Sequence, residues 1–474
     1  MSPPTKIFSA TPKPPSTTRA PVVLLVVPSV LLTTVLPLVE PILIVVPAPA
    51  KFTVVALALI RLKVVSSVVK DPPFTASVLA SVVAPENGTS YWGYTTGLAA
   101  LVVAILGPIL GGFADTRARR KLYLSIVVLI GVVANILLWR VEPNNSFIWF
   151  ALIFSFFSIL ANELMFVFYN ALLPSVASKK NMGRISGIGW AVGYFGAIVA
   201  LVIALAIFIM PEKAPFGLDK DSSEHIRATQ ILAGLWLLIF SLPLFFFVKE
   251  GKAASNLSKP WEIIKAGWKE IGQIPGLRKF LIARMLYVDG LTVVFAFAGI
   301  FAAKVFGFST QDVLLFAIAV NFTCGVGALI GGWFDDKLGS FNTIRISLIF
   351  LIIFGFCVLL SPTATYFWIF GLVTGIFIGP VQSASRSLVS HLAPAEHRAQ
   401  IFGFYMLAGK ITSFLGPMVY ATIVLWATQS TLIENLSFYL FGEGDSTLGE
   451  RAGMVTAVLF FIIGFIVLGR KKPG

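Results

Sequence analysis

The stretch "GGFADTRARRKL", Gly111 to Leu122, places a cluster of charge between two apolar segments. Its charged members are one acid and four bases: Asp115, Arg117, Arg119, Arg120 and Lys121. The whole chain of 474 residues is 57% hydrophobic and only 12% charged, about half the charge of a typical soluble domain. So little charge cannot cover a water-facing surface. We therefore predict an all-α membrane protein in which this stretch connects two spanning helices.

Apolar runs long enough to cross a bilayer recur along the chain. A spanning helix needs about 20 such residues. Eleven runs follow residue 90: 91–112, 121–140, 147–173, 184–210, 228–248, 280–303, 310–334, 341–360, 365–390, 400–427 and 452–469. Residues 21–70 are apolar but interrupted by Pro28, Pro37 and Pro41. One crossing there, near 22–47 or 51–69, gives twelve helices, and two give thirteen.

Basic residues fall in alternate connectors, and such connectors face the cytoplasm. They include the opening stretch, the loop with Lys179 and Lys180, the linker 249–279 and the tail at 470–474. The opposite loop at 428–450 holds acids and no Lys or Arg before residue 451. Twelve helices then place both termini in the cytoplasm, whereas thirteen place the N-terminus outside. We expect the cell (plasma or inner) membrane, or the vacuolar membrane in a eukaryote.

An internal duplication divides the chain into two similar parts. Gly111 and Asp115 recur as Gly332 and Asp336, and the glycines of the run at 184–210 recur near 403–409. Two parallel halves follow, with binding expected near the midplane between them. The predicted domains are a disordered cytoplasmic tail (1–20), an N-terminal six-helix half (21–248), a linker with an amphipathic helix (249–279), a C-terminal six-helix half (280–469) and a basic tail (470–474).

The motif of Gly111, Asp115, Arg119 and Arg120 resembles the loop motif of the major facilitator superfamily. Ala118 stands where that family usually has Gly, and the copy at Gly332 and Asp336 is weaker. Together, "GRISGIGWAVGYFG", "FLIARMLYVDG", "LIGGWFDDKLGS", "GPVQSASRSLVSHLAP" and "FGFYMLAGKITSFLGP" resemble the vacuole-effluxer-like branch from about residue 80 onward. That branch includes fungal vacuolar amino-acid exporters and bacterial relatives. The resemblance implies a twelve-helix bundle and a solute carrier.

Several polar residues interrupt the apolar runs, where charge costs at least about 2.5 kcal/mol to insert. The predicted substrate-binding or coupling set is Asp289, Lys410, Arg386, Gln382, Glu163, Asn170 and Asn321. We expect Asp289 or Glu163 to exchange a proton and the two basic residues to bind a substrate carboxylate. In the structural alternatives, Asp289 and Lys410 form a fixed pair, Arg386 reaches the cytoplasmic headgroups, and Glu163 only packs helices.

The predicted function is secondary active transport of a small polar solute, such as an amino acid, coupled to protons. The sequence has no GxxxxGK[ST] loop for ATP. No cofactor, metal site, enzymatic role or nucleic-acid partner is predicted, and we expect a monomer in a lipid bilayer. The alternatives are a drug or metabolite exporter of the same fold and a membrane receptor or scaffold without transport.

The loop motif itself predicts a latch. Gly111 allows close approach of a neighbouring helix, and Asp115 can pair with Arg119 or with a helix N-terminus across the loop. We expect this contact to hold the two halves together on the cytoplasmic side.

Overall fold

The fold is known from a computed structural model, which describes residues 88–470 except 118, 143, 210, 251–259, 414 and 430–447. All regular structure in this part is helical. The longer helices are α3 (Gly88–Thr116), α4 (Arg120–Leu138), α5 (Ile148–Ala171), α6 (Met182–Ile203), α7 (Glu224–Phe247), α8 (Pro260–Gln273), α9 (Leu277–Phe306), α10 (Thr310–Leu338), α11 (Ser340–Leu359), α12 (Ala364–Leu392), α13 (Arg398–Ala408), α14 (Leu415–Gln429) and α16 (Leu448–Leu468). The short ones are η1 (Asn145–Phe147), η2 (Leu173–Ser175), η3 (Ala204–Ile209), η4 (Pro215–Gly217) and η5 (Ala395–His397). The predicted N-terminal tail and the crossing or crossings in 21–70 lie outside the described residues.

The predicted spanning helices are largely confirmed. Ten helices in the described part are long and apolar enough to cross a membrane. The 24 residues of α5, for example, extend about 36 Å at 1.5 Å per residue. Large apolar side chains such as Leu129, Trp149 and Ile466 are 59%, 72% and 67% exposed. Their exposure agrees with a surface that faces lipid.

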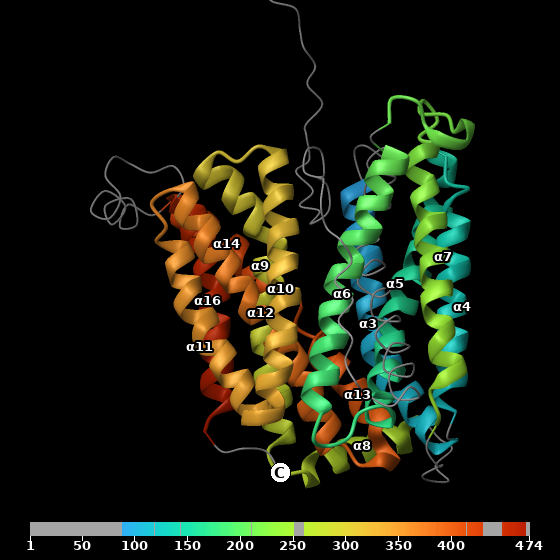
Figure 1. The fold of residues 1–474 in the computed structure, drawn as a ribbon, viewed down its shortest axis with the longest axis vertical. Coiled ribbons are helices and arrows are strands. Elements are labelled where there is room, and N and C mark those ends of the chain that lie inside the picture. Colours follow the sequence, from blue (N-terminus) through green and yellow to red (C-terminus); the bar gives the residue numbers. More distant parts are fainter. Residues whose placement is uncertain are drawn as a thin grey trace, which may run out of the picture.

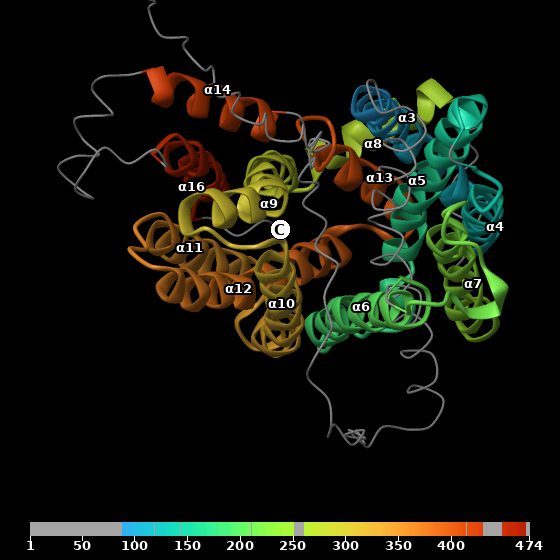
Figure 2. The ribbon, with the colours of Figure 1, turned by 90° about the horizontal axis from the view of Figure 1, so that it is seen from above.

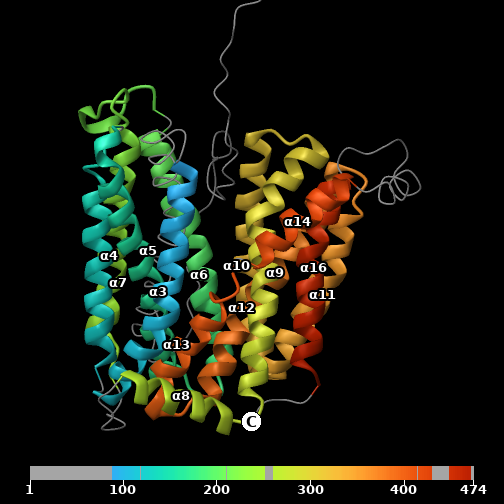
Figure 3. The same cartoon turned by 180° about the vertical axis from the view of Figure 1, so that it is seen from behind.

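The helices form two bundles side by side, as Figures 1 and 3 show. In the N-terminal half, α5 packs against α3 and α4, and α4 against α7. In the C-terminal half, α9 packs against α16 and α12 against both α10 and α11. The halves meet where α6 contacts α10 and α12, and where α13 contacts α3 and α5 (Figure 2).

The described part of the linker contains one helix, α8. It lies across one end of the bundle and packs on α3 and α13 (Figure 1). Gly267 faces the side chain of Gln400, and the Trp268 ring lies 6.0 Å from that of Phe404. We call this end of the bundle, which also carries the connectors after α3, α5 and α10, the basic end.

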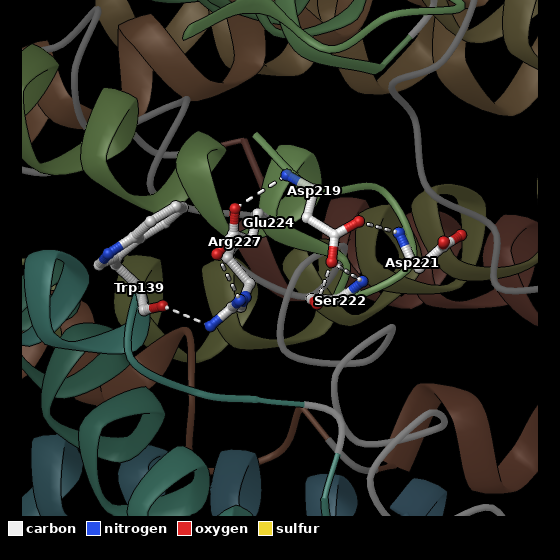
Figure 4. Close-up of polar contacts among 6 residues, drawn as sticks. All are labelled: Trp139, Asp219, Asp221, Ser222, Glu224 and Arg227. Carbon is white, nitrogen blue, oxygen red and sulfur yellow. Dashed lines mark hydrogen bonds and ion pairs between the residues drawn. The ribbon is translucent and has the colours of Figure 1, made fainter. Parts of the chain in front are cut away.

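At the opposite end, a hydrogen-bonded loop sets the start of α7 (Figure 4). The Asp219 carboxylate accepts the backbone N–H groups of Asp221 at 2.9 Å and Ser222 at 3.2 Å. The hydroxyl of Ser222 also donates to it and holds the pKa of Asp219 below its usual value. Arg227 then donates to the Trp139 carbonyl at 3.3 Å, which ties α7 to the end of α4.

One predicted span is wrong as a continuous helix. The run at 400–427 is divided into α13 and α14, with non-helical turns from Gly409 to Ser413. Pro417 has no N–H to donate and would collide with the carbonyl four residues earlier in a continuous helix. It is accepted here in the first turn of α14. The hydroxyl of Ser413 donates to the Lys410 carbonyl at 2.9 Å, which stabilises the turn. We call residues 409–413 the helix break.

Candidate functional site

Glycines bring the two halves into contact at the basic end. A Cβ atom at Gly111 would lie 2.4 Å from the Ala399 carbonyl oxygen in α13. A Cβ atom at Gly332 would lie 2.8 Å from the Gly183 carbonyl oxygen in α6. Only glycine fits either position without a shift of backbone, so the close approach predicted for Gly111 is confirmed and also occurs at Gly332.

Asp115 connects the N-terminal half to the start of α13. Its Oδ2 accepts the Gln400 backbone N–H at 2.9 Å, and its Oδ1 accepts Arg120 Nε at 2.7 Å. Arg120 Nη2 also donates a hydrogen bond to the Ala395 carbonyl oxygen at 2.6 Å. The helix N-terminus predicted as a partner of Asp115 is therefore confirmed. The predicted arginine is wrong, because Arg120 forms the ion pair while Arg119 is exposed.

Asp336 makes the equivalent contact in the second copy. Its Oδ1 accepts the Arg184 backbone N–H at 3.1 Å, and Arg184 Nε lies 3.4 Å from Oδ2. Arg184 is the third residue of α6, as Gln400 is the third residue of α13. Each aspartate thus places negative charge at the positive end of a helix from the other half. We call these two contacts together the latch.

Arg386, in α12, makes a third contact between the halves. Its guanidinium donates to the carbonyl and the hydroxyl of Ser186 at 2.7 and 2.9 Å, and to the Tyr169 hydroxyl at 3.2 Å. The residue is only 2% exposed. The expected alternative, in which it reaches the headgroups, is therefore wrong in this structure. Gly189 provides room, since a Cβ there would lie 2.9 Å from Arg386 Nη2.

Lys410 and Glu163 form an ion pair between the halves. Lys410 Nζ, in the helix break, lies 2.8 Å from Glu163 Oε1 in α5. The two side chains are 28% and 7% exposed. The expected alternative of a pair between Asp289 and Lys410 is wrong in this structure, because Lys410 contacts the acid of the other half instead.

Asp289 is buried and has no counter-ion among the described residues. It is 1% exposed, and neither carboxylate oxygen has a hydrogen-bond partner among the described residues. The hydroxyl of Thr412, in the helix break, lies beside it. A Cβ atom at Gly416, in the first turn of α14, would lie 2.9 Å from the Asp289 carbonyl oxygen. The helix break therefore has Lys410 paired with one half and Asp289 buried beside its other end.

The three uncharged members of the predicted set differ in their placement. Gln382 donates to the Tyr194 hydroxyl at 3.0 Å, and so joins α12 to α6. Asn170 is buried in α5, and its Oδ1 has no partner within the described chain. Asn321 donates at 2.9 Å to Ala317, one turn earlier in its own helix. The Asn321 side chain thus hydrogen-bonds within α10.

Sequence reasoning missed Arg284. This residue of α9 is 9% exposed, and its Nη1 donates to the Tyr405 carbonyl at 2.6 Å. Its guanidinium lies 3.5 Å from the centre of the Tyr405 ring, and a Cβ at Gly409 would approach it to 2.7 Å. A cation at the C-terminal end of α13 stabilises the carbonyls that the helix break leaves free. The signal was present, since Arg284 interrupts an apolar run just as Arg386 does.

Comparison with known families gives one match over most of the chain. The profile of the family described as "Vacuole effluxer Atg22 like" matches residues 70–432. An MFS-type transporter of Bacillus subtilis, YxiO, is 23% identical over 406 residues, which cover 84% of this chain and 88% of that protein. Autophagy-related protein 22 of Eremothecium gossypii is 24% identical over 400 residues, 74% of each chain.

Solved structures agree on the fold. The human organic anion transporter MFSD10 superposes with a TM-score of 0.68 at 13% identity and covers 89% of this chain and all of that one. The Escherichia coli fucose:proton symporter FucP superposes with a TM-score of 0.59 at 14% identity, covering 88% and 97%. At such identities the likeness concerns the fold alone. It confirms the predicted bundle of the major facilitator type.

Proposed function

This chain belongs to the vacuole effluxer Atg22-like family of the major facilitator superfamily, and we propose that it carries a small carboxylate-bearing solute, such as an amino acid, together with a proton. It is a multi-pass membrane transporter and not an enzyme. The identities of the solute and of the coupling ion are proposed here. We also propose that the basic end faces the cytoplasm and that a single chain is the working unit.

The observation that carries the proposal is the ion pair between Lys410 and Glu163. It joins the two halves near the middle of α5, at the depth where a carrier holds its substrate. A charge inside a membrane protein is normally paired or functional. Here each half contributes one charge, so the pair can form or separate as the halves move.

The proposed mechanism is an exchange of partners on Lys410. In the empty carrier, Glu163 is ionised and neutralises the Lys410 ammonium. When Glu163 takes up a proton it loses its charge, and a substrate carboxylate replaces it on Lys410. Lys410 then has a counter-charge in both the empty and the loaded carrier, which lowers the cost of moving between conformations. Proton and solute therefore travel in the same direction.

The latch and Arg386 supply the gate in this proposal. Opening the basic end requires Asp115 to leave Gln400, Asp336 to leave Arg184, and Arg386 to leave Ser186. All three contacts lie between Lys410 and the basic end. With these contacts formed, as in the present structure, the solute site is closed toward the cytoplasm.

Flux into proteoliposomes tests the proposal. Purified protein is reconstituted, and uptake of radiolabelled amino acids is followed with and without an inwardly directed proton gradient. We expect saturable uptake of at least one amino acid that the gradient accelerates, and no such uptake with Lys410→Gln. Saturable uptake at the same rate with and without the proton gradient would contradict proton coupling. Absence of flux for every amino acid would contradict the substrate class, as a receptor or a drug exporter would predict.

A further inference from the structure

One side of α8 carries basic residues around an exposed tryptophan. Lys265, Trp268, Lys269 and Gly272 are all exposed. They recur at the three- and four-residue spacing that aligns side chains on one side of a helix. The Trp268 side chain is 52% exposed, which is unusual for so large an apolar group in contact with water. We call these four residues the outer face of α8.

The opposite side of α8 is fixed against α13. Gly267 and Ile271 are buried there. A Cβ atom at Gly267 would lie 2.5 Å from the side chain of Gln400 and 2.7 Å from the ring of Phe404. These contacts hold α8 against the residue whose backbone N–H binds Asp115 in the latch. They also set the rotation of α8, so the outer face points away from the bundle.

The residues that follow α8 add positive charge to its outer face. The Arg278 guanidinium lies 5.3 Å from the centre of the Trp268 ring, and its Nη2 would lie 2.6 Å from a Cβ atom at Gly272. Lys279, next in the chain, is exposed. Glu262, an exposed acid one turn before Lys265, lowers the charge of this surface but leaves it positive.

The position of α8 matches that of a phospholipid headgroup layer. The long helices cross the membrane, whereas α8 runs across their end (Figures 1 and 3) and lies beside α3 (Figure 2). Tryptophan next to Lys and Arg is typical of the boundary between lipid and water, where the ring meets acyl chains and the cations meet headgroups. Ammonium and guanidinium groups donate charge-assisted hydrogen bonds to phosphate oxygens.

We propose that the outer face of α8, together with Arg278, binds the headgroups of anionic phospholipids. The basic side chains bind the phosphate, and Trp268 inserts among the upper parts of the acyl chains. A lipid bound in this way presses α8 onto α13 behind Gln400. The inference does not depend on which solute the protein carries or on the coupling ion.

Quenching of Trp268 fluorescence by brominated lipids tests the proposal. The protein is placed in nanodiscs of phosphatidylcholine that contain increasing fractions of either brominated phosphatidylglycerol, which is anionic, or brominated phosphatidylcholine, which is zwitterionic. Subtracting the emission of a matched Trp268→Phe protein isolates the signal of Trp268 from that of the other tryptophans. The lipid fraction at half-maximal quenching then gives the selectivity for the anionic headgroup.

The wild type should be quenched by phosphatidylglycerol at a lower fraction than by phosphatidylcholine, by about tenfold or more, since each base near a headgroup layer contributes about fivefold. Lys265→Gln/Lys269→Gln should lower this selectivity by about tenfold or more, and Arg278→Gln by about fivefold. The matched control is Lys180→Gln/Lys249→Gln, which removes two exposed bases elsewhere at the basic end and should keep the wild-type selectivity.

Four results would overturn the inference. If neither lipid quenched Trp268, the outer face would lie in water, where an acidic soluble protein could bind it. Equal quenching by the two lipids would show contact with the bilayer without selection of the headgroup. Unchanged selectivity in Lys265→Gln/Lys269→Gln would place the lipid site elsewhere. An equal loss in the control would assign the effect to the total charge of the basic end rather than to α8.

Discussion

Lys410 and Glu163 contribute to stability as a pair rather than singly. Replacing Lys410 by Gln leaves a carboxylate that is 7% exposed without its counter-ion. Breaking a fully buried pair costs about 3–5 kcal/mol, and we expect somewhat less here because Lys410 is 28% exposed. The double variant Glu163→Gln/Lys410→Gln should recover part of that loss. Thermal unfolding in detergent measures the stability of the two single variants and of the double variant. If the loss in the double variant equalled the sum of the two single losses, the two residues would not form a direct pair.

The contribution of Arg386 to stability depends on its planar guanidinium, which makes three hydrogen bonds to Ser186 and Tyr169. Lysine keeps the charge but cannot reproduce this geometry. Arg386→Lys should destabilise the protein by about 2–3 kcal/mol, against about 1 kcal/mol for Tyr169→Phe, which removes one bond. The same unfolding assay compares them. If Arg386→Lys lowered the free energy of unfolding no more than Tyr169→Phe, the planar geometry of the guanidinium would not contribute to stability.

At the residue scale, the sequence shows which charged residues lie inside apolar runs, but not which of them contact one another. A charge inside an apolar run is visible in the sequence, so Glu163, Asp289, Arg386 and Lys410 were found. Their partners depend on how α5, α6, α9 and α12 are arranged in space, which no spacing along the chain records. For that reason one alternative paired Lys410 with Asp289, whereas in the structure Lys410 lies beside Glu163.

At the element scale, the contact of α3 with α13 gives a sharp steric prediction. A Cβ at Gly111 would lie 2.4 Å from a backbone oxygen of α13, whereas one at Gly107, on the same helix, would lie 3.6 Å from its nearest atom. Gly111→Ala should therefore force the halves apart and lower the flux strongly, while Gly107→Ala should change little. Reconstituted flux and cysteine labelling at the basic end provide the readouts. Similar behaviour of the two variants would contradict close contact at Gly111.

The helix break shows what a hydropathy pattern omits. The run at 400–427 is apolar enough to span, so its length predicted one helix. Pro417 and Gly409 were visible but are tolerated in many membrane helices. The contact that fixes the break, Arg284 on the Tyr405 carbonyl, comes from another helix. By contrast, the amphipathic spacing of α8 and the approximate positions of the other spanning helices were predictable, because they depend on local sequence.

For the whole molecule, the two copies of the latch should set the balance between conformations. Asp115→Asn weakens the charged contact with Gln400 and Arg120. Such contacts are worth about 1–2 kcal/mol, so the open population at the basic end should rise about fivefold to thirtyfold. Spin labels at the exposed positions Lys179 and Lys337, one in each half, report the distance.

The control for this prediction is substrate affinity. Asp115 contacts the start of α13 at Gln400, whereas Lys410 follows the other end of that helix, so the intrinsic affinity of the open site should change little. A distance distribution identical to that of the wild type would contradict the latch. So would a large loss of intrinsic affinity, which would place Asp115 in the solute site.

The central claim is that Glu163 carries the proton while Lys410 carries the solute, and solute counterflow in proteoliposomes tests it most directly. Glu163→Gln mimics the protonated acid permanently. The variant should exchange labelled for unlabelled amino acid across the membrane but lose accumulation driven by a proton gradient. Gradient-driven accumulation equal to that of the wild type in Glu163→Gln would contradict the account.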